Sequence, residues 1–208
     1  FIVFSRIIST ITSFALFPFV VEHVGKEVYG VYLIVMSVTG YFGLLDFGVM
    51  SALTKYVSEY HGKGDNEGIN RIINASFSFY VFIGIFIAIL LFACSAYFNS
   101  FFKVDSSNID VIRKLFIIAA FSAIFIWPLS TFRGAIQGLN MWKIDATVNI
   151  VNNIFLAMAT LFLLFKGYGI VQLFIATQVL TILANITLYY IGHKYTGFRI
   201  SFPYGEFN

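Results

Sequence analysis

The chain has 208 residues, of which 59% are hydrophobic and 11% are charged, and its formal net charge is +3. Soluble domains carry about 25% charged residues, so this composition, with a mean hydropathy of +0.87, excludes a soluble globular protein and indicates an integral membrane protein. Because no block of like charges is present, we expect no nucleic-acid partner.

Long apolar runs predict six membrane-spanning helices, because a helix needs about 20 mostly apolar residues to cross a bilayer. In chain order the predicted spans are 1–21, 29–57, 72–98, 114–138, 144–165 and 169–192. The ten-residue alternation of membrane strands is absent from the sequence. We therefore expect an all-α bundle of six transmembrane helices over 1–194, with 195–208 as a cytoplasmic connector.

The distribution of Lys and Arg favours a cytoplasmic N-terminus. In that orientation about eight basic residues fall on the inner side and about five on the outer side. The sequence starts at Phe1 inside an apolar segment and ends after a more polar stretch. We therefore expect a fragment of a longer protein, with residues missing at both ends.

The second predicted span contains a carboxylate, Asp46. A charge at the centre of a membrane helix costs about 2.5–3.5 kcal/mol on insertion scales, so it needs a partner or a function. Counting residues along the spans places Arg6 and Arg133 at a similar depth. One interpretation is a structural ion pair. A second is a basic cavity lining that binds phosphate, with Asp46 as its counter-ion or as a proton carrier. A third is an arginine that extends to the membrane interface and has no role in function.

Amide side chains accompany these charges in the predicted spans four and five. Helical spacing places Asn149, Asn152 and Asn153 near one face. They are explained either by hydrogen bonds between helices or by a surface that binds a hydroxyl-rich ligand such as a sugar. The candidate substrate-binding residues are therefore Arg6, Arg133, Gln137, Asn149 and Asn153.

Small and kinking residues predict how the spans pack. Gly134 and Gly138 have the spacing that allows two helices to approach closely, and the same is expected of Gly40, Gly43 and Gly48 in span two. Pro128 removes a backbone hydrogen bond in span four and should kink it.

Enzymatic chemistry finds little support in the sequence. The three histidines, His23, His61 and His193, lie near span ends without a shared ligand spacing, so we expect no metal site. No nucleophile elbow or phosphate loop is present, and Cys94 lies alone in an apolar run. We therefore expect no catalytic residues and no cofactor.

Two segments, Gly25-Lys-Glu-Val-Tyr-Gly-Val-Tyr-Leu33 and Leu44-Leu-Asp-Phe-Gly-Val-Met-Ser-Ala-Leu-Thr-Lys-Tyr-Val57, together resemble the N-terminal signature of polysaccharide biosynthesis proteins, the O-antigen flippases. These belong to the MOP (multidrug/oligosaccharidyl-lipid/polysaccharide), or MATE-like, exporter superfamily. Arg133-Gly-Ala-Ile-Gln-Gly138 also looks like the family's stretch in span four.

The resemblance implies a two-lobed transporter of the bacterial inner membrane, of which this chain is one six-helix lobe. It implies that undecaprenyl-diphosphate-linked oligosaccharide is moved to the outer leaflet by alternating access. The implied partners are membrane lipid, that substrate, a missing C-terminal lobe and the polysaccharide polymerase machinery.

Three other functions stay open at this point. A cation-coupled multidrug or small-molecule antiporter of the same superfamily would have a defined cation site, for which Asp46 is a candidate. A membrane enzyme of envelope synthesis would need a large outer loop, which the short connections do not provide. A structural membrane subunit is the remaining alternative.

Overall fold

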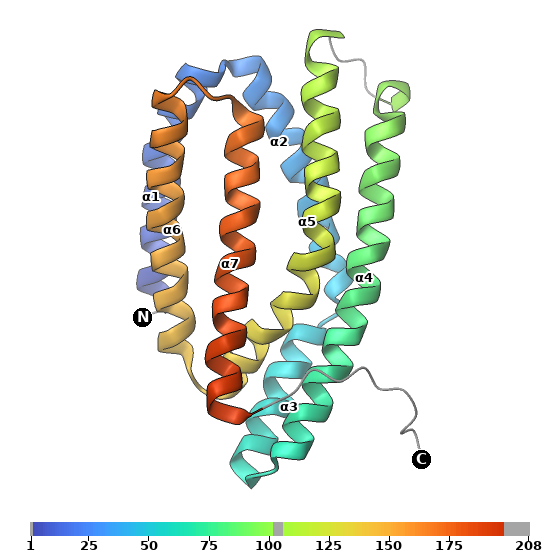
Figure 1. The fold of residues 1–208 in the computed structure, drawn as a ribbon, viewed down its shortest axis with the longest axis vertical. Helices are drawn as coiled ribbons and strands as arrows, with labels where there is room; N and C mark the ends of the chain where they lie inside the picture. The colour runs from blue at the N-terminus through green and yellow to red at the C-terminus, as the bar shows by residue number, and fades with distance from the viewer. Residues whose placement is uncertain (1, 102–105, 198–208) are drawn as a thin grey trace.

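The computed structural model describes residues 2–101 and 106–197, with side chains described except at 2–6, 8, 9, 13, 97–101, 106–108 and 196. Within these ranges every regular element is a helix, which confirms the predicted all-α membrane fold (Figure 1). The elements are α1 (Ile2–Val24), α2 (Lys26–Tyr41), the short 3-10 helix η1 (Phe42–Asp46), α3 (Val49–Lys63), α4 (Asn66–Phe101), α5 (Ser106–Gly138), α6 (Trp142–Phe165) and α7 (Ile170–Thr196).

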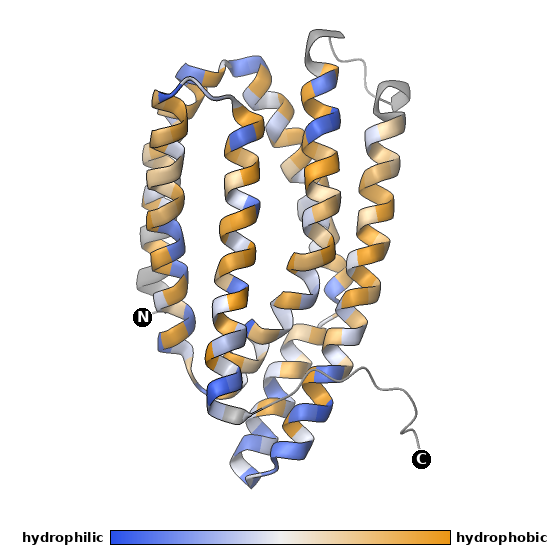
Figure 2. Cartoon of the chain, viewed as in Figure 1, coloured by the Kyte–Doolittle hydropathy of each residue, from blue (hydrophilic) through white to orange (hydrophobic). Residues whose placement is uncertain are grey.

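Five segments of the described chain are long and apolar enough to cross a membrane. They are Lys26–Asp46, Asn66–Ala96, Ile109–Gly138, Trp142–Phe165 and Ile170–Tyr195, and α1 adds a shorter apolar stretch, Thr10–Val24. Figure 2 shows hydrophobic residues along the middle of the long helices and hydrophilic residues toward their ends. The chain is therefore a multi-pass membrane protein.

The single helix predicted over 29–57 is instead divided into two helices. After α2 the chain tightens into η1, and then Phe47 and Gly48 take left-handed backbone conformations with φ of 48° and 79°. Two consecutive residues in this region end the helical hydrogen-bond ladder, so α3 starts again at Val49. Hydrophobic periodicity cannot detect such a break, because the apolar side chains continue through it.

Helix α5 is the centre of the bundle and contacts α2, α3, α4, α6 and α7. One apolar core lies among α2, α4, α5 and α7 and includes Val35, Ile87 and Phe116. A second lies around α3 and the last turns of α5 and includes Leu53 and Phe132. The helix contains Pro128 and changes direction along its length, as Figure 1 shows, which agrees with the predicted kink.

Glycines on α5 allow α3 to approach closely, as predicted. A Cβ atom at Gly138 would lie 2.6 Å from Val57 Cβ, and one at Gly134 would lie 2.7 Å from Met50 Sδ. By contrast, a Cβ atom at Gly40 would meet no atom within 4 Å. The prediction that the glycines of span two serve close packing is therefore wrong, since Gly43 and Gly48 also face open space.

The far end of α3 is polar and lies at the bottom of the view in Figure 2. There Lys63 Nζ lies 2.6 Å from Glu59 Oε1, one helical turn away. This hydrogen bond and the attraction between the charges lower the pKa of the Glu59 carboxyl and raise the pKa of the Lys63 ammonium. Both side chains are exposed, which places this end of α3 in a hydrated region.

Candidate functional site

A tight turn between α5 and α6 brings together the polar residues of the predicted spans four and five. Asn140 has a φ of 60°, and its N–H donates to Gln137 O at 3.0 Å, while Met141 N–H donates to Ile136 O at 3.0 Å. This pair of hydrogen bonds is the Schellman arrangement that ends many helices. The turn therefore sets the last turns of α5 against the first turns of α6.

The carboxylate of Asp145 is the centre of the resulting polar cluster. Its Oδ2 accepts a hydrogen bond of 2.8 Å from Gln137 Nε2, and its Oδ1 accepts one of 3.1 Å from Asn149 Nδ2. Arg133 Nε lies 3.5 Å from the same Oδ1. The residue Asp145 is 6% exposed, so this charge is buried and held by three polar side chains. We call Arg133, Gln137, Asp145 and Asn149 the Asp145 cluster.

The guanidinium of Arg133 is paired with a charge but is only weakly used as a hydrogen-bond donor. Its Nε is buried and donates no hydrogen bond, because the contact to Asp145 is long. An arginine has five N–H donors in a rigid fork, and 33% of this side chain is exposed. The arrangement can therefore present a positively charged fork to an oxyanion while Asp145 compensates the buried end.

The structure pairs Arg133 with Asp145 and not with Asp46. Asp46 Oδ1 accepts a hydrogen bond from the Tyr80 hydroxyl and one of 3.3 Å from Met50 N–H. Met50 lies in the first turn of α3, whose N–H groups have no partner within the helix. Asp46 therefore caps the helix that starts after the break, and among the described side chains it forms no ion pair.

Of the remaining predicted residues, those whose side chains the structure describes do not lie at this cluster. Arg6 belongs to α1, but its side chain lies outside the described residues, so its predicted pairing stays a prediction. Asn153 is half-buried on α6, two helical turns beyond Asp145, and Asn152 lies in a groove between α6 and α7. Gln137 and Asn149 are thus the two predicted amides that the structure brings to Asp145, the counter-ion of Arg133.

Sequence reasoning missed Asp145, and a signal for it was present. Arg133 and Asp145 lie on either side of the same short connection, at similar distances from it. Two antiparallel helices joined by such a turn bring those positions to the same height. Asp145 stands in the first turn of α6, where an acidic residue is also explained by the positive end of the helix dipole.

Within the described residues, no three His, Cys, Asp or Glu side chains come together in a way that could hold a metal ion. The comparison with protein families matches MatE over residues 2–163, which include α1 to α5 and nearly all of α6 with the whole Asp145 cluster. No curated protein matches the sequence. Since the match covers most of a chain that folds as a multi-pass helical bundle, the protein belongs to the MatE family of membrane transporters, in the MOP exporter superfamily.

Proposed function

We propose that this transporter moves undecaprenyl-diphosphate-linked oligosaccharide units from the inner to the outer leaflet of the bacterial cytoplasmic membrane. Membership of the MatE family gives membrane transport as the general activity. The narrower substrate class is supported by the resemblance of residues 25–57 to O-antigen flippases. The products would be the repeat units of a cell-surface polysaccharide, passed on to its polymerase machinery.

The observation that carries this proposal is the partly exposed side chain of Arg133 beside a buried carboxylate. A diphosphate headgroup is a dianionic ligand with several acceptor oxygens, and an arginine fork binds such oxygens in pairs. Asp145 would hold the Arg133 guanidinium in position and leave its other N–H groups to bind the phosphate oxygens. Arg6 is a second proposed cation for the same headgroup, and Asn153 a proposed contact for the glycan.

Gln137 and Asn149 have a different proposed role from direct sugar binding. Their amide N–H groups donate to the two oxygens of Asp145, so they position the counter-ion of Arg133. Asp46 is proposed to act at the helix break, since both of its contacts fasten α3 and α4 there. This assignment differs from a proton carrier, which must release its hydrogen bonds during transport.

Alternating access in this proposal needs a second lobe, so the proposed partner is a C-terminal lobe of the same protein. With the N-terminus in the cytoplasm, the α5–α6 turn lies on the cytoplasmic side, where a lipid-linked oligosaccharide is assembled. The headgroup would meet Arg133 from that side, and the polyprenyl tail would stay in the bilayer. Rocking of the two lobes would then open the outer side.

A cation-coupled antiporter is the second candidate function, favoured by one observation. Asp145 is a buried carboxylate between two amides and an arginine. A buried carboxylate needs a compensating charge, and a coupling cation could replace Arg133 in that role when its surroundings change. In that case Asp145 would bind the coupling cation during transport, and Arg133 would neutralise Asp145 when no cation is bound.

The two functions are separated by depleting the protein in its natural host. The flippase proposal expects lipid-diphosphate oligosaccharide to accumulate on the inner leaflet and surface polysaccharide to fall, with unchanged sensitivity to cationic drugs. Complementation with the full-length protein should restore export, and a full-length Arg133→Gln variant should not. If the amounts of lipid intermediates stay unchanged and drug sensitivity rises, the antiporter function is supported and the flippase function is contradicted.

A further inference from the structure

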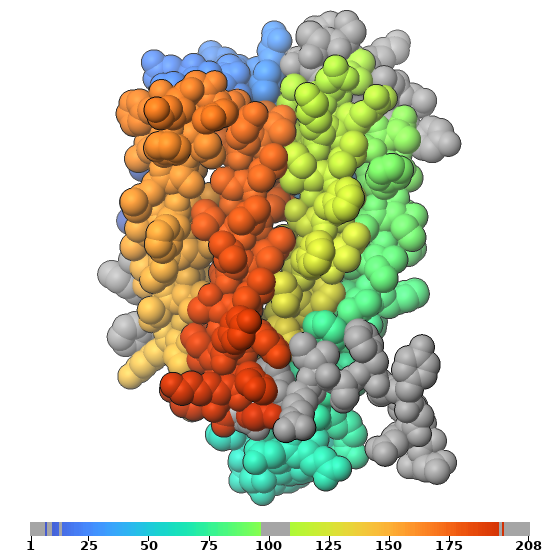
Figure 3. Space-filling model, in the orientation of Figure 1, coloured from blue at the N-terminus to red at the C-terminus, as the bar shows by residue number. Residues whose placement is uncertain are grey.

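Helices α6 and α7 lie side by side on one face of the molecule (Figure 3). A groove lies between them. Two adjoining hollows of about 400 Å³ each form this groove, and they share Thr147 and Val148. One hollow lies where α6 begins and α7 ends, and the other continues toward Phe155 and Leu180. We call the two hollows together the α6–α7 groove.

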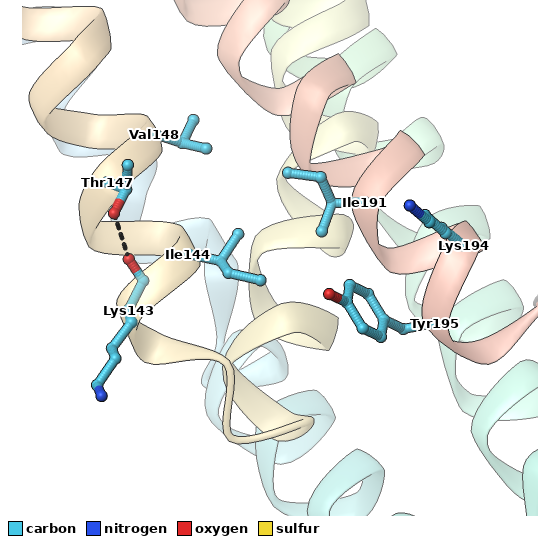
Figure 4. A pocket seen from close by; sticks show the side chains of 7 residues that line it. All are labelled: Lys143, Ile144, Thr147, Val148, Ile191, Lys194 and Tyr195. Atoms are coloured by element: carbon cyan, nitrogen blue, oxygen red, sulfur yellow. Dashed lines mark hydrogen bonds between the residues drawn. The ribbon is translucent and has the colours of Figure 1, made fainter.

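The groove is mainly apolar and is open to its surroundings. Figure 4 shows Ile144 and Val148 of α6 pointing toward Ile191 of α7 across the gap. Farther along, Val151 is 45% exposed and Phe155 is 55% exposed, although both line the groove. An apolar surface left open at this position in a membrane protein is suited to a hydrocarbon chain.

The length of the groove matches one leaflet of a bilayer. At 1.5 Å per residue, the stretch of α6 from Lys143 to Phe155 spans about 18 Å. The hydrocarbon core of a bilayer is about 30 Å thick, so one leaflet contributes about 15 Å. An acyl chain that starts at Lys143 therefore ends near Phe155.

Positive charge is concentrated at one end of the groove. Lys143 of α6 and Lys194 of α7 are among the residues that line that end. In Figure 4 the Tyr195 hydroxyl is turned toward the gap, whereas the Lys143 side chain extends from α6 away from it. The neighbouring acid, Asp145, is buried in its own cluster and does not line the groove. The far hollow is lined by apolar residues, threonines and Asn152, without a charged side chain.

We propose that the α6–α7 groove holds an anionic glycerophospholipid as a resident ligand. Its phosphate would contact Lys194 and, after the Lys143 side chain turns toward the groove, Lys143 as well. One acyl chain would lie along the groove toward Phe155. The site is separate from the proposed transport site, because Arg133 does not line the groove. It would make the protein's stability depend on the lipid composition of its membrane.

The first test measures lipid retention by the full-length protein purified in detergent. Native mass spectrometry would count bound dioleoylphosphatidylglycerol and dioleoylphosphatidylcholine during parallel titrations. We expect the anionic lipid to be retained preferentially. A Lys143→Gln, Lys194→Gln double variant should need roughly tenfold or more phosphatidylglycerol for the same occupancy, because each lysine near an anionic surface contributes about fivefold.

Lys166 provides the matched control, since it is an exposed lysine at the opposite end of the same two helices. A Lys166→Gln variant should retain phosphatidylglycerol like the unmodified protein. An equal loss in this control would mean diffuse attraction of anionic lipid and would overturn the proposal. Equal retention of the two lipids, or efficient displacement of phosphatidylglycerol by undecaprenyl diphosphate, would overturn it as well.

A second variant tests the groove without changing its charge. Thr147→Trp should place an indole where the two hollows meet, because Thr147 is exposed and lines both. It should abolish the rise in melting temperature that phosphatidylglycerol gives the unmodified protein. Met158→Trp, at a 60% exposed position of α6 outside the groove, should keep that rise. A normal rise in Thr147→Trp would show that the lipid binds elsewhere.

Discussion

Gln137 Nε2 donates a hydrogen bond of 2.8 Å to Asp145 Oδ2, which fastens the last turn of α5 to the first turn of α6. The two residues are separated by the α5–α6 turn alone, so the contact is local in sequence but joins two membrane helices. Because Arg133 lies one helical turn before Gln137, the same contact fixes the distance between the guanidinium and its counter-ion.

Removing the charge of Asp145 should destabilise the protein through Arg133. In Asp145→Asn the buried Nε of Arg133 loses its compensating charge, and the expected loss in the free energy of unfolding is about 1–3 kcal/mol. Unfolding in detergent measures this loss. An Arg133→Met, Asp145→Asn double variant should recover part of it, because no buried cation then remains. Strictly additive losses would contradict a coupling between the two residues.

Arg133→Lys tests whether the planar fork matters for transport. A lysine keeps the charge but not the paired donors, so oligosaccharide export should fall by about tenfold or more if it binds the diphosphate. The melting temperature should change less than in Asp145→Asn, because the charge beside Asp145 is kept. Export at the normal rate in Arg133→Lys would contradict the proposal that the Arg133 guanidinium binds the diphosphate through paired hydrogen bonds.

The sequence predicts that Arg133 needs a carboxylate partner, but it does not predict which one. Counting residues along separate spans gives depth in the membrane and says nothing about the face of a helix, so Asp46 and Arg133 looked like partners. The structure shows that Asp46 faces Tyr80 and the start of α3. The approximate positions of the helices could be predicted from the lengths of the apolar runs, because a helix must have a minimum length to cross a bilayer.

The helix break at Phe47 and Gly48 could not be read from hydropathy. Both flanking segments are apolar enough to continue a membrane helix, and the hydropathy of a residue does not depend on its backbone dihedral angles. Gly48 was a weak signal, since glycine tolerates its φ of 79°. The close approach of Gly84 to α5, where a Cβ would lie 2.9 Å from Ala123 O, was likewise not foreseen, because a lone glycine has no spacing pattern.

Asn140 offers a direct test of the turn that builds the Asp145 cluster. Its φ of 60° is a conformation that glycine adopts freely and β-branched residues avoid. Asn140→Gly should leave stability within about 1 kcal/mol of the unmodified protein, whereas Asn140→Val should lower it by about 1–3 kcal/mol. Both variants keep every member of the cluster, so unfolding measurements report on the turn. Equal stabilities would mean that the turn does not constrain the cluster.

Asp46 should tolerate loss of charge better than loss of its oxygen. Asn is as effective as Asp at a helix N-terminus, so Asp46→Asn should keep the cap on Met50 N–H and retain export. Asp46→Ala should lower the free energy of unfolding by about 1–2 kcal/mol, because the N–H at the start of α3 loses its acceptor. Transport abolished in Asp46→Asn, with stability unchanged, would restore Asp46 as a proton carrier.

The contact between α3 and α5 should be sensitive to a single methyl group. Gly138→Ala places a Cβ 2.6 Å from Val57 Cβ and 2.8 Å from Thr54 O, so backbone must move, and the expected destabilisation is about 1–3 kcal/mol. Gly40→Ala is the matched control, because its Cβ would meet no atom within 4 Å. Gly40 is the second-last residue of α2, so this second substitution should be neutral or stabilising by at most about 1 kcal/mol. Unfolding in detergent compares the two variants, and equal effects would show that α3 is not packed against α5 through Gly138.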